Sequence, residues 1–196
     1  MELDYYKLQI TGSAWTTKIK HYQYLLKEGL DWMIEDVANI PMSILDLGCG
    51  DGWGTEYLRK QLPQKYIKIV GGDIDEHKLK AAEERGVKVE YQDIHHVTGK
   101  WDIIFCSHTL EHSYDYKLAL KSIIKALKLG GLLYLIVPIE KEDPRSYNPS
   151  HTQWLKNCDI IITEIMKYPN TRIAFETNRI RDNVEYWAII EKHGSN

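Results

Sequence analysis

The segment Ser107-His108-Thr109-Leu110-Glu111-His112 gathers side chains that can exchange protons or bind ligands. If it is helical, His108, Glu111 and His112 lie at positions i, i+3 and i+4 on one face. A further histidine, His151, lies downstream in the stretch 148–154. Because histidine titrates near neutral pH, His108 and His151 are the candidates for a general base. Local hydrogen bonding is the alternative interpretation of the same residues.

A glycine-rich turn, Asp46-Leu-Gly48-Cys-Gly50-Asp-Gly52-Trp53-Gly54, is the second group of interest. Gly48 and Gly50 allow a sharp turn and a close approach of the backbone to a ligand. A dinucleotide-binding turn would place a third glycine where this chain has Trp53, and the sequence has no phosphate-binding loop ending in Gly-Lys-Ser/Thr. Asp46 suits a ligand with an ammonium or sulfonium charge better than a pyrophosphate. The turn therefore predicts a nucleotide-like ligand.

Alternating strand and helix signals would position both groups. The sequence predicts helices over 17–40, 53–62, 76–85 and 115–128, and strands over 43–47, 66–70, 87–91, 102–106 and 132–137. Apolar strands separated by helices predict a parallel sheet covered on both faces.

After Pro138 the pattern changes. We expect a short helix near 153–157 and longer strands at about 160–166, 172–176 and 184–190. The short connections require at least one antiparallel strand. The predicted fold class is α/β, with a doubly wound, Rossmann-like, mostly parallel seven-stranded sheet and an antiparallel C-terminal edge.

Composition excludes several classes of protein. The formal charge of the 196 residues is −3, with acidic and basic residues interleaved, so no polyanion-binding field is evident beyond a local patch. The widely spaced cysteines indicate neither a disulfide framework nor a cysteine zinc site: Cys49, Cys106 and Cys158. The beginning of the chain lacks a signal-peptide pattern, and no apolar run is long enough for a bilayer. We expect a cytoplasmic protein without membrane contact.

Five motifs follow one another near the ends of the predicted strands. Asp46 to Gly50 matches Asp-x-Gly-x-Gly, and 70–75 matches a second motif with an acid, Asp73, at a strand end. The segments 91–94, 105–112 and 127–131 complete the set, although Leu129 stands where proline is common. Over residues 43–140 the chain resembles the class I S-adenosylmethionine-dependent methyltransferases, particularly the branch with a Leu-Glu-His motif. The resemblance implies S-adenosylmethionine as the cofactor and Asp73 on its ribose hydroxyls. The implied cofactor-binding residues are Asp46, Gly48, Gly50, Asp73, Ile74, Asp93, Ile94 and Ser107.

The same resemblance offers two interpretations of the histidine-rich segment. In most Leu-Glu-His methyltransferases the Glu and His are structural and support the loop near the cofactor. In ubiquinone-biosynthesis O-methyltransferases and small-RNA 2′-O-methyltransferases, a Glu-x-x-Glu-His segment binds a divalent metal. Here His108 replaces the first Glu, and the corresponding metal set would be His108, Glu111, His112 and His151. We favour the interpretation without a metal.

The resemblance implies an enzyme of the EC 2.1.1 type. We predict a single domain with an N-terminal helical lid (1–42), a cofactor-binding core (43–140) and C-terminal substrate-side strands (141–196). The predicted acceptor is a small molecule, at a hydroxyl of a sugar or other metabolite, and nucleic acid is disfavoured as a partner by the charge. One alternative is a divalent-metal-assisted RNA 2′-O-methyltransferase, and another is a catalytically silent relative that binds a cofactor or a partner. The oligomeric state does not follow from the sequence.

Overall fold

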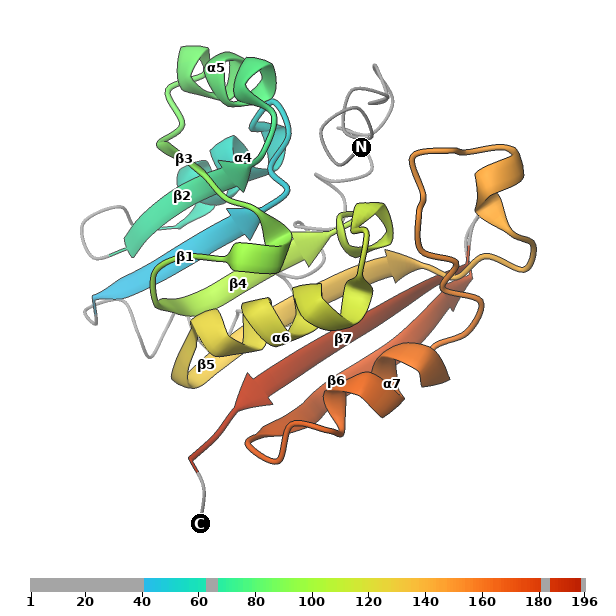
Figure 1. The fold of residues 1–196 in the computed structure, drawn as a ribbon. Coiled ribbons are helices and arrows are strands. Elements are labelled where there is room, and N and C mark those ends of the chain that lie inside the picture. The colour runs from blue at the N-terminus through green and yellow to red at the C-terminus, as the bar shows by residue number, and fades with distance from the viewer. Residues whose placement is uncertain (1–40, 63–66, 181–183, 195–196) are drawn as a thin grey trace. The chain divides into compact units, whose positions relative to one another are not determined.

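The computed structural model describes residues 41–62, 67–180 and 184–194 (Figure 1). The predicted helix over 17–40 lies outside the described residues, as does the predicted lid except for its last two positions. The described residues belong to two compact units, 41–93 and 94–194, each of which is treated by itself below. The division of a single domain into lid, core and substrate-side strands remains a prediction.

The described part of the first unit alternates strand and helix. Its elements are β1 (Met42–Leu47), α4 (Trp53–Gln61), β2 (Ile67–Asp73), α5 (Glu76–Glu84) and β3 (Val89–Tyr91). β2 pairs in parallel with both β1 and β3. The strand predicted over 66–70 ends too early, because Gly71, Gly72 and Asp73 continue to pair with β3. A Cβ at Gly71 would lie 2.9 Å from the Cys49 sulfur, so this glycine serves close packing within the strand.

The second unit carries the longer strands. Its elements are η1 (Ile94–His96), β4 (Trp101–Ser107), η2 (Leu110–His112), α6 (Tyr116–Ala126), β5 (Leu127–Pro138), η3 (Pro144–Ser146), α7 (Asp159–Ile165), β6 (Thr171–Ile180) and β7 (Val184–Lys192). β4 and β5 are parallel, and β7 runs antiparallel to both β5 and β6. α6 packs on β5, and α7 contacts α6. The core of this unit consists of fully buried apolar side chains, including Ile104, Phe105, Leu120, Ile123 and Leu135.

The strand order of the described sheet is β3-β2-β1-β4-β5-β7-β6. This is a doubly wound order, which extends in two directions from the first strand. The predicted fold class is confirmed, including the antiparallel strand near the C-terminal edge. Among the described helices, none has both the length and the apolar character that a membrane span requires. Cys49 and Cys106 are buried and Cys158 half-buried, and no disulfide joins these three described cysteines.

Two elements predicted for the C-terminal third are wrong. Residues 160–166 were expected as a strand but lie largely in α7, in which Ile161 and Ile165 are buried four residues apart. Burial of one helical face overrides the β-propensity of this isoleucine-rich run. The helix expected near 153–157 is absent from the described chain. Instead, the backbone N–H of Gln153 donates to the Glu111 carbonyl, and this non-local bond holds the segment against η2.

A third difference concerns Gly130-Gly131. The sequence predicts that these glycines end the helix over 115–128, whereas α6 ends at Ala126 and the glycines lie within β5. Trp101 pairs with Leu127 and Ile103 with Leu132, so residues 128–131 form a bulge. Gly130 has a φ of 75°, which explains why a glycine is favoured in this bulge.

Candidate functional site

The glycine-rich turn follows β1 in the first unit. Gly48 and Gly50 have φ values of 73° and 59°, in the left-handed region that favours glycine. The backbone N–H groups of Gly48 and Cys49 both donate to the Gly72 carbonyl, at 2.7 and 3.0 Å, which ties the turn to β2. A Cβ at Gly50 would meet no described atom within 4 Å. The turn therefore presents bare backbone to open space, as close approach of a ligand requires.

Gly52 has a different role in the same turn. A Cβ at this position would lie 2.6 Å from the Cβ of Ala82, so the glycine allows α5 to pack against the turn. Trp53, which replaces the third glycine of a dinucleotide turn, begins α4 and lies 3.4 Å beneath the Arg85 guanidinium. Trp53, which distinguishes the turn from a dinucleotide-binding turn, thus packs against Arg85 through a cation–π contact.

Asp73 ends β2 and is oriented by three backbone amides. Its Oδ2 accepts from the Gly50 N–H at 2.9 Å, and its Oδ1 accepts from Ile74 and Asp75 at 2.8 and 3.0 Å. The residue is only 8% exposed. A carboxylate offers about four lone-pair sites, so acceptor capacity remains for a ligand hydroxyl. The protein therefore holds Asp73 rigidly beside the turn. This is the position that the resemblance implies for the ribose-binding acid.

The Asp46 carboxylate, which the sequence predicts beside the turn, is buried against α4. It is fully buried, and its Oδ2 accepts from the Thr55 hydroxyl at 2.6 Å, which ties β1 to α4. Of the other implied cofactor residues, Asp93 is half-buried at the end of the first unit. Ile94 and Ser107 are buried in the second unit. The cofactor roles of all these residues remain predictions.

Asp75 has a role that the sequence reasoning missed. It is the N-cap of α5, and its side chain accepts from the N–H groups of His77 and Lys78 at 2.9 and 3.3 Å. Ser and Thr share this capping ability of Asp. An acid one residue before a helix-forming run is the sequence signal that could have identified Asp75 as the N-cap.

The histidine-rich segment of the second unit is not one helix. Only Leu110–His112 forms a helical turn, η2, and His108 has a positive φ of 51°. The condition under which His108, Glu111 and His112 would share a helical face is therefore not met. The Nε2 of His108 lies 3.0 Å from Oε1 of Glu185, and its Nδ1 lies 3.4 Å from Oε1 of Glu111. His108 bridges two carboxylates.

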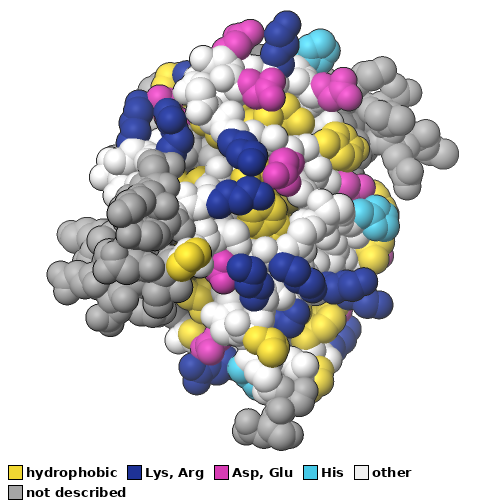
Figure 2. Space-filling model, turned by 90° about the vertical axis from the view of Figure 1, so that its left-hand side faces the viewer, with side chains coloured by type: hydrophobic (Ala, Val, Ile, Leu, Met, Phe, Trp, Pro, Cys, Tyr) yellow, Lys and Arg dark blue, Asp and Glu magenta, His cyan; other side chains and the backbone are white. Residues whose placement is uncertain are grey.

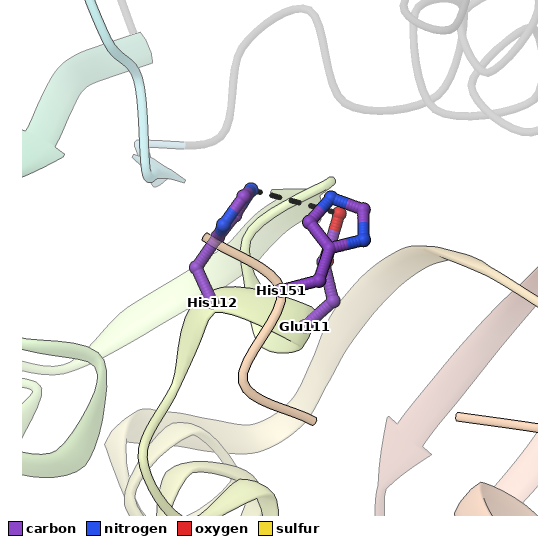
Figure 3. A group of neighbouring side chains, drawn as sticks. All are labelled: Glu111, His112 and His151. Atoms are coloured by element: carbon purple, nitrogen blue, oxygen red, sulfur yellow. Dashed lines mark ion pairs between the residues drawn. The ribbon is translucent and has the colours of Figure 1, made fainter. Parts of the chain in front are cut away.

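Glu111, His112 and His151 point toward one another (Figure 3). Each offers one ligand atom, and these atoms lie within 4.8 Å of one another. The imidazole rings of His112 and His151 are nearly perpendicular, with centroids 4.8 Å apart. The structure thus brings together three of the four residues of the implied metal set. They come from η2 and from the loop after β5, about 40 positions apart in the chain.

The loop around His151 is fixed to η2 by several hydrogen bonds. His112 Nδ1 lies 2.9 Å from the Ser150 carbonyl, and Gln153 Nε2 donates to the carbonyls of Ser113 and Tyr114 at 2.9 Å each. His151 Nδ1 lies 2.7 Å from Oε1 of Glu140. These bonds define the position of His151 relative to Glu111 and His112, and they explain why the loop is irregular.

The two carboxylates beside His112 and His151, those of Glu111 and Glu140, have unusual surroundings. Glu111 is fully buried and accepts no hydrogen bond from a backbone amide of the described residues; its nearest donor is the Nδ1 of His108, 3.4 Å from its Oε1. Although burial alone would raise it, the neighbouring histidines hold the pKa of Glu111 below its usual range. Burial would lower the pKa of His108, but hydrogen bonds to Glu111 and Glu185 raise it to about 9. Burial lowers the pKa of His112 and raises that of Glu140.

Glu140 and Glu185 were not among the predicted site residues. Glu140 follows the end of β5, and an acid just beyond a parallel strand is a usable sequence signal. Glu185 lies in β7, where strand pairing sets it opposite Pro138. That register depends on the tertiary fold, and no local pattern indicates it.

Lysines gather at the end of α6 in the second unit, and basic side chains are frequent on the face drawn in Figure 2. Lys100, Lys121 and Lys125 line a hollow of about 380 Å³ together with His96. The Lys100 ammonium donates to the Lys125 carbonyl at 2.7 Å, and that of Lys192 donates to two further carbonyls near the C-terminus of α6. Neutralising the negative end of the helix accounts for these two lysines.

Comparison with known proteins gives the family. The family model described as a methyltransferase domain matches residues 19–195. The chain belongs to the class I S-adenosylmethionine-dependent methyltransferases. The chain is 33% identical over 101 residues to a ubiquinone biosynthesis O-methyltransferase of Idiomarina loihiensis, covering 46% of this chain and 40% of that protein. It is 31% identical over 123 residues to a trans-aconitate 2-methyltransferase of Variovorax paradoxus, covering 56% and 45%. The matched region spans less than half the length of either relative.

Solved structures support the fold of the chain. The magnesium protoporphyrin IX methyltransferase of Synechocystis with bound S-adenosylmethionine superposes with a TM-score of 0.66 at 16% identity, covering 98% of this chain and 91% of that one. A methyltransferase of Clostridium acetobutylicum gives a TM-score of 0.63 at 16% identity, covering 93% and 100%. These likenesses show the fold alone.

Proposed function

We propose that this protein transfers a methyl group from S-adenosylmethionine to a small-molecule acceptor, at a hydroxyl of a sugar or other metabolite. The observation that carries the proposal is Asp73, which three backbone amides orient beside an open glycine turn. The cofactor-binding roles of the residues around it follow from this proposal. The two curated relatives named above, which methylate small molecules according to their names, favour the same class of acceptor.

The reaction is an in-line displacement. The acceptor oxygen forms a bond to the methyl carbon, the carbon–sulfur bond breaks, and the sulfonium becomes a neutral thioether. Alignment and exclusion of water provide most of the acceleration, up to about 7–11 kcal/mol in well-oriented systems. The hydroxyl proton must also leave. Both ring nitrogens of His108 face carboxylates, so His151 is the better placed proton acceptor of the two candidates in the metal-free chain.

Calorimetric titration with S-adenosylmethionine, S-adenosylhomocysteine and NAD tests the donor. We expect both sulfur ligands to bind and NAD to bind more weakly. Tighter binding of NAD, or no binding of either sulfur ligand, would overturn the proposal.

Transfer of a labelled methyl group into fractionated cell extract tests the acceptor. Label in the small-molecule fraction supports the proposed function. Label in RNA would instead support the RNA 2′-O-methyltransferase, and cofactor binding without label in any fraction would support a catalytically silent relative. The cytoplasmic location remains a prediction that fractionation of cells can test.

A further inference from the structure

We propose that Arg85 is a positioning residue for the cofactor site: its side chain holds residues 51–53 of the glycine turn in the conformation that receives S-adenosylmethionine. This inference rests on the proposed function, in which the turn binds the methyl donor. Arg85 is the C-cap of α5, and the contacts that carry the inference all lie within the first unit. None of the five sequence motifs includes this residue.

The backbone of the turn has unusual conformational freedom. Gly48, Gly50 and Gly52 all adopt positive φ values, of 73°, 59° and 84°. Glycine loses more conformational entropy on ordering than any other residue, so such a turn needs contacts that hold it. The N–H groups of Gly48 and Gly50 donate to residues of β2 and fix the first half of the turn. Residues 51–53 form the second half, which lies beyond these bonds.

The Arg85 side chain reaches this second half from α5. Its Nε donates to the Asp51 carbonyl at 3.0 Å, and its guanidinium carbon lies 3.4 Å from the centroid of the Trp53 ring. A directional N–H bond and a planar group stacked on an indole together fix both position and orientation. The ion pair with the Asp51 carboxylate adds little, because its 3.9 Å separation lies between partly exposed side chains. Arg85 therefore grips the residues on both sides of Gly52.

The end of α5 is itself fixed, so the Arg85 side chain starts from a defined point. The backbone N–H groups of Arg85 and Val87 both donate to the Ala82 carbonyl at 3.1 Å. The same Ala82 packs against the turn, since a Cβ added at Gly52 would lie 2.6 Å from its own Cβ. Close packing at Gly52 seats the helix on the turn, and the guanidinium then ties the two together.

This arrangement matters for binding because Asp51 directly follows Gly50, the position at which bare backbone faces open space. A turn that is held in one conformation binds its ligand without a further ordering cost. If the turn is competent for only about one tenth of the time, the apparent affinity falls about tenfold. Arg85 acts on the cofactor through Asp51 and Trp53 in this proposal.

Calorimetry with S-adenosylhomocysteine on the full-length protein tests the inference. We expect Arg85→Ala to bind about 10-fold more weakly than the parent protein. Arg85→Lys should recover part of this loss, because an ammonium keeps the charge near Trp53 but lacks the planar fork of the guanidinium. The matched control is Lys80→Ala, which removes an exposed cation from the same helix and should leave the affinity unchanged.

Amide hydrogen exchange of the ligand-free protein distinguishes positioning from general destabilisation. In Arg85→Ala, the Gly52 amide should exchange faster than in the parent, whereas the Gly71 amide within β2 should keep its rate. A variant that only loses stability would exchange faster at both positions. Urea denaturation identifies the conditions under which each variant is folded, and all affinities are measured there.

Equal affinities of the parent and Arg85→Ala for S-adenosylhomocysteine would overturn the inference, as would equal acceleration of exchange at Gly52 and Gly71. If Arg85→Ala does not fold, Arg85→Lys takes its place, and parent-like affinity in that variant has the same consequence. Absence of S-adenosylhomocysteine binding by the parent contradicts the proposed function instead. Faster exchange confined to the turn of the variant would then still show that Arg85 holds residues 51–53.

Discussion

Two buried carboxylates, Asp73 in the first unit and Glu111 in the second, have opposite hydrogen-bond environments. Three backbone amides donate to Asp73, from the glycine turn and from the residues that follow β2. Glu111 accepts no backbone hydrogen bond within the described ranges, and its charged neighbours are the imidazoles of His108 and His112. Backbone amides therefore satisfy Asp73, whereas histidine side chains compensate the charge of Glu111.

This difference bears on how each carboxylate is stabilised. A carboxylate fixed by backbone amides is already positioned before a ligand arrives, so binding costs little reordering. A buried carboxylate that faces only side chains depends on those side chains for its stabilisation. The three predictions that follow test this contrast, from the largest expected effect to the smallest.

Gly52→Ala should be the most damaging change to the first unit. The added Cβ lies 2.6 Å from Ala82 Cβ, at a φ of 84° that L residues rarely adopt. Overpacking and the left-handed conformation together should lower the free energy of unfolding by about 3 kcal/mol. Urea denaturation measures the loss. Gly50→Ala, whose Cβ meets no described atom, is the control and should lose about 1 kcal/mol.

Asp73→Asn and Glu111→Gln compare the two carboxylates directly. Asp73→Asn should lower the free energy of unfolding by about 2–3 kcal/mol, because buried amide donors lose a charged acceptor. Glu111→Gln should cost less, about 1 kcal/mol, because no backbone amide among the described groups donates to it and His108 keeps Glu185 as a partner. Urea denaturation gives both values, with Glu76→Gln on the exposed start of α5 as the control. Equal losses for the two variants would break the comparison.

Asp75→Ala should have the smallest effect. Its side chain caps α5, and loss of an N-cap costs about 1 kcal/mol. Asp75→Ser should retain nearly all of the stability, because serine caps as well as aspartate. Urea denaturation of both variants measures the difference. Equal losses would show that the charge of Asp75, rather than its cap, matters for the first unit.

Sequence reasoning succeeded where the determining interactions are local. Gly48 and Gly50 adopt the positive φ values that a glycine turn predicts, and Asp73 stands at the end of its strand. Asp46 shows the limit within the same motif. Its place beside the turn follows from sequence, but its burial against Thr55 depends on how α4 packs.

In the second unit, more of the secondary structure and of the side-chain contacts depends on residues far apart in the chain. The isoleucine-rich run at 160–166 suits either a strand or a helix, and burial of Ile161 and Ile165 on one face selects α7. His108 contacts Glu185, which strand pairing sets opposite Pro138. His151 contacts Glu140 across an irregular loop.

The sequence by itself determined the family, the order of strands and helices around the glycine turn, and the identity of the acid after β2. These features depend on backbone conformations and hydrogen bonds between neighbours in the chain. Only the tertiary structure decided which residues surround Glu111, because His112 and His151 meet there through contacts across about 40 positions. Packing set imidazoles rather than backbone amides beside that carboxylate, and no local pattern encodes this arrangement.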